Sequence, residues 1–210
     1  MSGEVSGARA VLVTGFAPFA GDAVNPSGDV LPLVEEMWPG PERLVTAVLP
    51  VAFGAAGDRV AELVAAHRPD VVVALGLAAG RPGVTPERVA VNLDDARIPD
   101  NDGAQPLDAP VVAGAPAAYF STLPVKAAVA ALLADGVPAA LSHTAGSFVC
   151  NHVFYRLQHD LAGSDVRSGF VHVPGYDVVA RPDLARGVVT LLRTVLDVRD
   201  DLGSVGGIVA

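Results

Sequence analysis

The sequence contains a single cysteine, Cys150, in a position that suits a nucleophile. It stands in the stretch 144–155, Thr-Ala-Gly-Ser-Phe-Val-Cys-Asn-His-Val-Phe-Tyr, where apolar residues begin to repeat with helical spacing. The small residues at 145–147 predict a strand-to-helix turn, which puts Cys150 in the first turn of the helix. Free N–H groups and the positive end of the helix dipole favour a thiolate there. A lone cysteine is, however, more often a small buried apolar residue, so this turn alone does not establish catalysis.

A cysteine nucleophile needs an imidazole that takes its proton and a third group that orients the ring. Of the five histidines, His172 is the best base candidate because it lies at the carboxyl end of a predicted strand, on the edge where Cys150 is expected. A hydrogen-bonded core histidine is an equally good interpretation. Glu87, Asp94 and Asp95 compete for the role of orienting carboxylate, and spacing does not decide between them.

Other kinds of site have weaker support. One cysteine without a paired histidine motif makes a poor zinc set, so we expect no metal. The glycine-rich stretch 76–83 has neither a dinucleotide fingerprint nor a phosphate loop, and we expect no cofactor. Phe16 and Phe19 flank a proline after the first predicted strand, where α/β sheets usually bind ligands. Their rings would either line a ligand pocket or fill the core.

Alternating strands and helices would position these residues, which is typical of an α/β fold. We expect strands at 10–14, 43–49, 70–75, 87–95, 139–143 and 169–173, and helices at 25–38, 57–67, 124–134, 149–161 and 184–198. The continuous apolar strand at 70–75 is typical of a sheet covered on both faces. We therefore predict one domain over residues 1–210: a three-layer α/β/α sandwich with a twisted, mostly parallel mixed sheet. Residues 1–8 would form a loose leader and residues 203–210 a frayed tail.

Composition and charge limit the possible partners and location. A chain of 210 residues, 51% of them hydrophobic, suits one domain with a large core. The net charge of −9 and the lack of any basic run argue against nucleic acid and anionic membranes as partners. No apolar run approaches the roughly 18 residues of a membrane span, and we expect no signal peptide. A lone cysteine cannot form an internal disulfide, which fits the cytoplasm.

Four segments follow one another in an order typical of a single enzyme family. They are Val-Leu-Val-Thr-Gly-Phe-Ala-Pro-Phe at 11–19 followed by Asn25-Pro26, Thr-Pro-Glu-Arg-Val-Ala-Val-Asn at 85–92 followed by Asp-Ala-Arg-Ile-Pro-Asp-Asn at 95–101, the cysteine stretch at 144–152, and Phe-Val-His-Val-Pro at 170–174. Together they resemble the pyroglutamyl peptidase I family, also called pyrrolidone-carboxylate peptidases. The similarity runs from about Val11 to Pro174, and the chain beyond Pro174 matches poorly.

The resemblance implies a cysteine peptidase that removes an N-terminal pyroglutamyl residue from peptides through a thioester acyl-enzyme. Carried over by position, it makes Cys150 the nucleophile, His172 the general base and acid, and Glu87 the residue that orients His172. It implies no cofactor and no metal. It also implies a homo-oligomer, a tetramer in many relatives.

The resemblance further implies an apolar pocket. Its expected walls are Phe16, Phe19, Ile98, Phe148 and Val149. Arg97 falls where a cation would stabilise the oxyanion, and Val51, where some relatives carry threonine, is left out of the pocket. Pyroglutamate is a compact neutral lactam, so apolar walls with a few backbone hydrogen bonds would suit it.

Some positions depart from the family pattern, and other function classes stay open. Ala17 replaces a usual acidic residue, Ala20 replaces a usual glycine in the same loop, and Gly175-Tyr176 interrupts the segment after His172. One alternative is a nucleoside-phosphorylase-like transferase, in which Cys150 would be dispensable. The other is a non-catalytic small-molecule-binding α/β module, which would keep the aromatic pocket without a reactive thiol.

Overall fold

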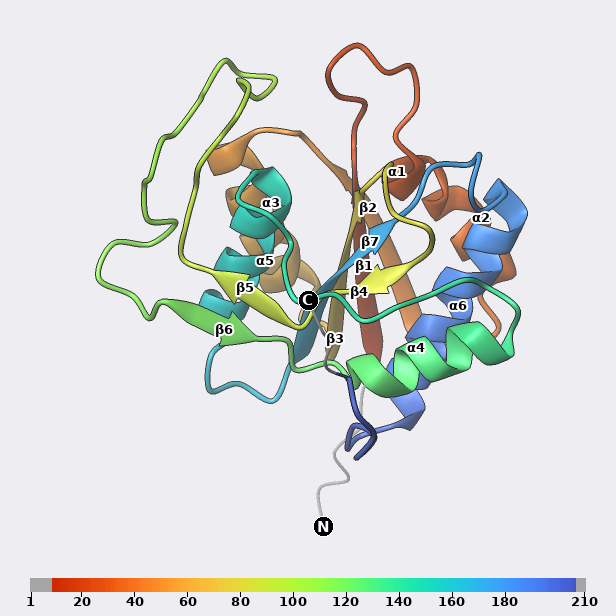
Figure 1. The fold of residues 1–210 in the computed structure, drawn as a ribbon. Coiled ribbons are helices and arrows are strands. Elements are labelled where there is room, and N and C mark those ends of the chain that lie inside the picture. The colour runs from red at the N-terminus through yellow and green to blue at the C-terminus, as the bar shows by residue number, and fades with distance from the viewer. Residues whose placement is uncertain (1–8, 207–210) are drawn as a thin grey trace.

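A five-stranded sheet runs through the middle of the computed structural model, which describes residues 9–206 (Figure 1). Its strands, in spatial order, are β2 (Arg43–Leu49), β1 (Ala10–Phe16), β3 (Val71–Leu77), β7 (Arg167–Val173) and β4 (Thr85–Pro86). The first four are parallel, and β4 pairs antiparallel with β7. The predicted leader, 1–8, and the last four residues of the predicted tail lie outside the described residues.

Helices cover both faces of this sheet, as the α/β/α prediction requires. One face carries α3 (Phe53–His67) and α5 (Val149–Asp160), and the other carries α1 (Pro26–Asp29), α2 (Leu31–Met37), α4 (Val125–Ala134) and α6 (Arg181–Asp197) (Figure 1). Successive strand residues point to opposite faces, so Leu12 joins the core with α3 and α5 while Val11 and Val13 join the other core. The fold class predicted from the sequence is confirmed.

Two predicted strands are wrong. Residues 87–95 do not form one strand: β4 ends at Pro86, and β5 (Val89–Val91) pairs instead with β6 (Ala118–Phe120), a strand that we did not predict. The Asn151 side chain donates to the carbonyls of Val91 and Leu93, both 2.9 Å away, so it binds the backbone where β5 ends and the chain bends away. Residues 139–143 make only isolated bridges from Ala139 and Ser142.

The chain turns sharply after β1, and this turn places the first aromatic loop. The Asn25 side chain caps α1 by accepting from the Ser27 N–H at 3.1 Å, and the Ser27 hydroxyl accepts from the Phe16 N–H at 3.0 Å. A Cβ atom at Gly15 would overlap the Ser27 carbonyl, so glycine allows α1 to lie against β1. These contacts fix the backbone at both ends of loop 17–24, which carries Phe19.

Candidate active site

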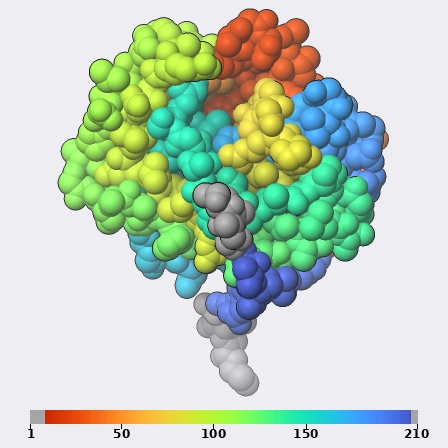
Figure 2. Space-filling model, in the orientation of Figure 1, coloured from red at the N-terminus to blue at the C-terminus, as the bar shows by residue number. Residues whose placement is uncertain are grey.

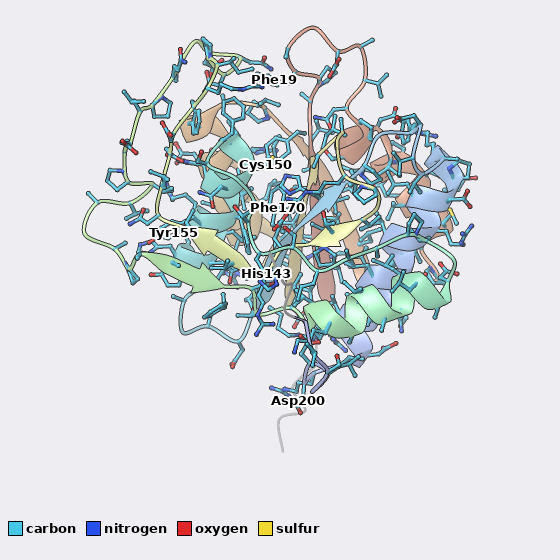
Figure 3. The ribbon with its side chains drawn as sticks, in the orientation of Figure 1. Phe19, His143, Cys150, Tyr155, Phe170 and Asp200 are labelled. Carbon is cyan, nitrogen blue, oxygen red and sulfur yellow. The ribbon has the colours of Figure 1, made fainter. Side chains whose placement is uncertain are left out.

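Cys150 is the second residue of α5 and lies above the carboxyl end of β3. A Cβ atom built on Gly76 would lie 2.9 Å from Cys150 Sγ and 2.6 Å from the Phe170 ring, so the thiol packs directly on the glycine backbone. Gly76 pairs in parallel with His172 on β7. The thiol and the imidazole therefore belong to neighbouring positions at one edge of the sheet, and Figure 3 shows Cys150 between Phe19 and Phe170.

His172 is held by Glu87, the carboxylate that the family resemblance implies. The His172 Nδ1 lies 2.7 Å from Glu87 Oε1, and both side chains are buried. The Glu87 N–H donates to the carbonyl of Phe170, two residues before His172, at 2.9 Å. Because β4 pairs with β7 just before Glu87, the backbone itself fixes the carboxylate beside the ring.

Burial shifts the proton affinities of the thiol and the imidazole in opposite directions. Burial, and then the Glu87 charge, raise the pKa of Cys150 to about 12, although Arg81 and the Cys150 N–H act to lower it. Burial lowers the pKa of His172, with Glu87 opposing the shift. The helix start acts in the expected direction, since the Cys150 N–H lowers the pKa of the thiol, but burial outweighs it. Both shifts favour a neutral thiol beside a neutral imidazole that can accept a proton.

An apolar cavity of about 210 Å³ opens beside Cys150. Phe16, Phe19, Phe148 and Val149 line it, as the resemblance implies. The Phe19 and Phe148 rings lie 5.3 Å apart, and Phe53 supports Phe148 edge-on at 5.2 Å. Figure 2 shows this face of the molecule, where the red N-terminal loop, the yellow segment after β3 and the teal segment around α5 meet.

Several lining residues were not predicted. They are Asp22, Val24, Asn25, Val51 and Leu77. Val51 and Leu77 lie just after β2 and at the end of β3, and their position at the carboxyl edge of the sheet is the signal that could have identified them.

The structure does not bring two of the expected site residues to the cavity. Ile98 is 38% exposed and does not line it. Arg97 is exposed and makes no side-chain hydrogen bond or ion pair among residues 9–206. A pocket wall at Ile98 and an oxyanion contact from Arg97 stay predictions.

The structure also separates the competing histidines and carboxylates. Asp94 binds His152, with Oδ2 2.8 Å from Nδ1, so it is not the partner of His172. His159 contacts the Tyr119 hydroxyl at 3.0 Å, and His143 contacts the Gly206 carbonyl at 3.0 Å. Of the five histidines, only His172 combines a buried carboxylate partner with a place beside the thiol. Residues 9–206 hold no group of three or more histidine, cysteine or acidic side chains that could bind a metal.

Comparison with known proteins agrees with this geometry. A family model described as pyroglutamyl peptidase matches residues 9–195. The chain belongs to this family. Its similarity continues past Pro174, where we predicted a poor match, and the model includes most of α6.

Relatives in the pyroglutamyl peptidase family are similar over nearly the whole chain. A pyrrolidone-carboxylate peptidase of Cupriavidus necator is 47% identical and covers 95% of this chain and 98% of its own length. The crystal structure of pyroglutamyl peptidase I from Bacillus amyloliquefaciens has a TM-score of 0.86 at 36% identity, covering 92% of this chain and 100% of that one. Pyrrolidone carboxyl peptidase from Thermococcus litoralis has a TM-score of 0.88 at 34% identity, with coverages of 93% and 99%. These findings support a peptidase and neither the transferase nor the non-catalytic alternative.

Proposed function

We propose that this member of the pyroglutamyl peptidase family hydrolyses the bond after an N-terminal pyroglutamyl residue, with Cys150 as the nucleophile. The observation that supports this best is the buried His172–Glu87 contact of 2.7 Å at the sheet edge where Cys150 packs on Gly76. Glu87 would fix the tautomer and orientation of the ring, so that its other nitrogen is free to take and return a proton.

The protonation states suggest how the reaction would begin. Starting from the protonated thiol and neutral imidazole that these shifts favour, His172 takes the Cys150 proton as Sγ attacks the pyroglutamyl carbonyl carbon. The C–S bond forms and the carbonyl electron pair moves to oxygen. The first turn of α5 has no side-chain cap among the described residues, which leaves its N–H groups for the oxyanion.

The remaining steps use the same imidazole. The protonated His172 donates to the departing peptide amine as the C–N bond breaks, which leaves a thioester on Cys150. His172 then takes a proton from water, and the hydroxide attacks the thioester carbon. The C–S bond breaks, the thiolate regains the proton from His172, and free pyroglutamate leaves.

The cavity also fits the substrate that we propose. Its walls are aromatic and aliphatic, and no Lys or Arg is among the residues that line it. The exposed Asp22 would disfavour a free carboxylate nearby. A neutral lactam avoids this repulsion. The lactam N–H and C=O would bind backbone groups of the pocket, and a prolyl residue, which lacks the lactam, would leave those groups unpaired and so bind more weakly.

A fluorogenic amide of pyroglutamate tests this function. The reduced wild-type protein should release the fluorophore, while Cys150→Ser, or wild type alkylated with iodoacetamide, should lose at least about 1000-fold in rate. The corresponding prolyl amide serves as the matched substrate control and should be cleaved far more slowly. If reduced wild type does not cleave the pyroglutamyl amide, or if cleavage survives alkylation, the proposal is wrong.

We also propose that the protein is a cytoplasmic homo-oligomer, most simply a tetramer, on the basis of the family resemblance. No helix among residues 9–206 is long and apolar enough to span a membrane. Light scattering coupled to gel filtration would give a mass near four times 21.3 kDa if the tetramer is right. Subcellular fractionation of the native host tests the location.

A further inference from the structure

Arg81, in the turn after β3, connects three segments of the site. Its Nη1 donates to Thr85 Oγ1 at 2.5 Å and to Glu87 Oε1 at 2.6 Å, while Nη2 donates to the Thr144 carbonyl at 2.9 Å. Thr144 begins the turn that leads to Cys150. One guanidinium therefore links the carboxylate that holds His172 to the chain that carries the thiol.

Arg81 and His172 use the same oxygen of Glu87. His172 Nδ1 lies 2.7 Å from Oε1, and Arg81 Nη1 lies 2.6 Å from the same oxygen. The Glu87 side chain is fully buried, and Oε2 has no hydrogen-bond partner among the described residues. Arg81 keeps its charge whether or not the ring is protonated, so it is the permanent counter-ion of this buried carboxylate.

The turn that Arg81 contacts is held by local bonds and by backbone bonds at its two ends, where the Asp95 N–H donates to the Ser147 carbonyl at 2.9 Å. The Thr144 hydroxyl accepts from the Gly146 N–H at 3.1 Å, and the Ser142 hydroxyl donates to the Thr144 carbonyl at 3.2 Å. Backbone bonds to the Glu87 segment come from Ser142, whose N–H donates to the Pro86 carbonyl at 3.0 Å and whose carbonyl accepts from the Arg88 N–H at 2.8 Å. The Arg81 bond, across 63 positions of the sequence, extends this connection to Thr144, two residues nearer to Cys150.

We propose that Arg81 is a positioning residue of the peptidase, which orients Glu87 against His172 and fixes the turn before Cys150. This inference rests on the proposed function. A lysine could keep the charge but not the planar fork that reaches separate acceptors, so the two roles can be distinguished by substitution.

The first experiment compares Arg81→Met and Arg81→Lys with wild type on the pyroglutamyl amide over a range of pH. The Met variant should lose about 10- to 100-fold in kcat with little change in KM, because misplacement of the base impairs chemistry more than binding. Glu87 and Arg81 are the charged groups that shift the pKa of His172, and Arg81 lowers it. The acid limb of the Met profile should therefore move to higher pH, while the Lys variant keeps the wild-type limb with a reduced kcat.

Arg59→Met is the matched control. Arg59 is exposed on α3 and, within residues 9–206, pairs only with Glu62, at 2.9 Å, so its loss should leave both kcat and the acid limb unchanged. If Arg81→Met has the kcat and acid limb of wild type, the positioning role is wrong although the peptidase function stands. If wild type itself is inactive, the proposed function fails first.

A second readout does not depend on turnover. Arg81 acts to lower the pKa of Cys150, so its loss should leave less thiolate and slow alkylation by iodoacetamide at a fixed pH. Mass spectrometry can follow this rate in the single-cysteine chain. Should Arg81→Met fail to fold, Arg81→Lys carries the test: a wild-type kcat in the folded Lys variant would overturn the need for the guanidinium fork.

Discussion

Cys150 Sγ lies so close to Gly76 that a methyl group at position 76 would stand 2.9 Å from the sulfur. Gly76→Ala should therefore displace the thiol and lower kcat by about 10-fold or more, since attack geometry tolerates little error. The same methyl group would press on Phe170, so we also expect a loss of about 1–3 kcal/mol in the free energy of unfolding. Rates with the pyroglutamyl amide and denaturant unfolding measure the two effects.

Gly54→Ala provides the control for this substitution. Gly54 is in the first turn of α3, and a Cβ atom there would meet no other atom within 4 Å. That variant should keep kcat and gain a few tenths to about 1 kcal/mol of stability. A Gly76→Ala enzyme with full activity would show that the thiol can shift without cost.

The pH dependence should follow His172. The base must be neutral, and burial lowers the pKa of His172 below its ordinary value of 6.5. The acid limb of kcat/KM should therefore lie below pH 6.5. The folded chain binds this proton less tightly than the unfolded chain. The free energy of unfolding linked to His172 is therefore fully present above pH 6.5 and falls as the pH drops from 6.5 toward the lowered pKa of the folded protein.

Glu87→Gln removes the negative charge of the Glu87 side chain and keeps its shape. Glu87 raises the pKa of His172 through its hydrogen bond and its charge, so the amide should move the acid limb to lower pH while reducing kcat. Profiles of kcat/KM against pH for the two enzymes provide the measurement. An acid limb at the same pH in Glu87→Gln would mean that Glu87 is not the charge that His172 senses.

The loop that carries Phe19 contains a residue in an unfavourable conformation. Ala20 has φ +53° and Gly21 has φ +87°, and the Asp22 N–H donates to the Phe19 carbonyl at 3.0 Å. Positive φ at both central positions is the pattern of a type I′ turn, where alanine is disfavoured. Ala20→Gly should stabilise the protein by up to about 1 kcal/mol, which corresponds to a rise of about 2–4 °C in Tm.

Gly21→Ala makes the opposite change at the neighbouring position and should lower Tm by a similar amount. A Cβ atom at Gly21 meets nothing within 4 Å, so the cost would be conformational and not steric. If Ala20→Gly leaves Tm unchanged, the turn does not strain the folded chain.

The sequence predicted the sheet better than it predicted the site. Strands β1 and β3 were found because they are nearly continuous apolar runs buried on both sides. The edge strand β2 is mostly half-exposed, and the buried strand β7 carries polar residues, but each still contains a short apolar run that the sequence pattern revealed. The alternation of apolar and polar residues at 87–95 was misleading, because the chain there does not form one strand. It bends after Val91, where the Asn151 side chain binds the carbonyls of Val91 and Leu93. Spacing could not choose among Glu87, Asp94 and Asp95, because the choice depends on the direction in which each side chain points; Asp94 turns to His152 instead. Arg81 was missed because its role depends on a contact across 63 positions.

The two phenylalanines of the first loop should differ in what their loss affects. Phe16 is 3% exposed, ends β1 and lies 6.4 Å from the Phe170 ring, so it fills the core as well as lining the cavity. Phe16→Ala should cost about 3–5 kcal/mol of stability together with activity. Phe19 is half-buried and packs mainly on Phe148, so Phe19→Ala should raise KM for the pyroglutamyl amide at a smaller cost in stability.

Phe120→Ala is the control for both substitutions, because Phe120 is 68% exposed on β6 and does not line the cavity. It should change neither KM nor, beyond about 0.5 kcal/mol, the free energy of unfolding. Steady-state kinetics of the three variants give KM, and urea unfolding gives the free energy of unfolding. If Phe19→Ala loses stability without any rise in KM, the ring supports the loop and does not touch the lactam, and the substrate pocket would have to be formed by Phe16, Phe148 and Val149 alone.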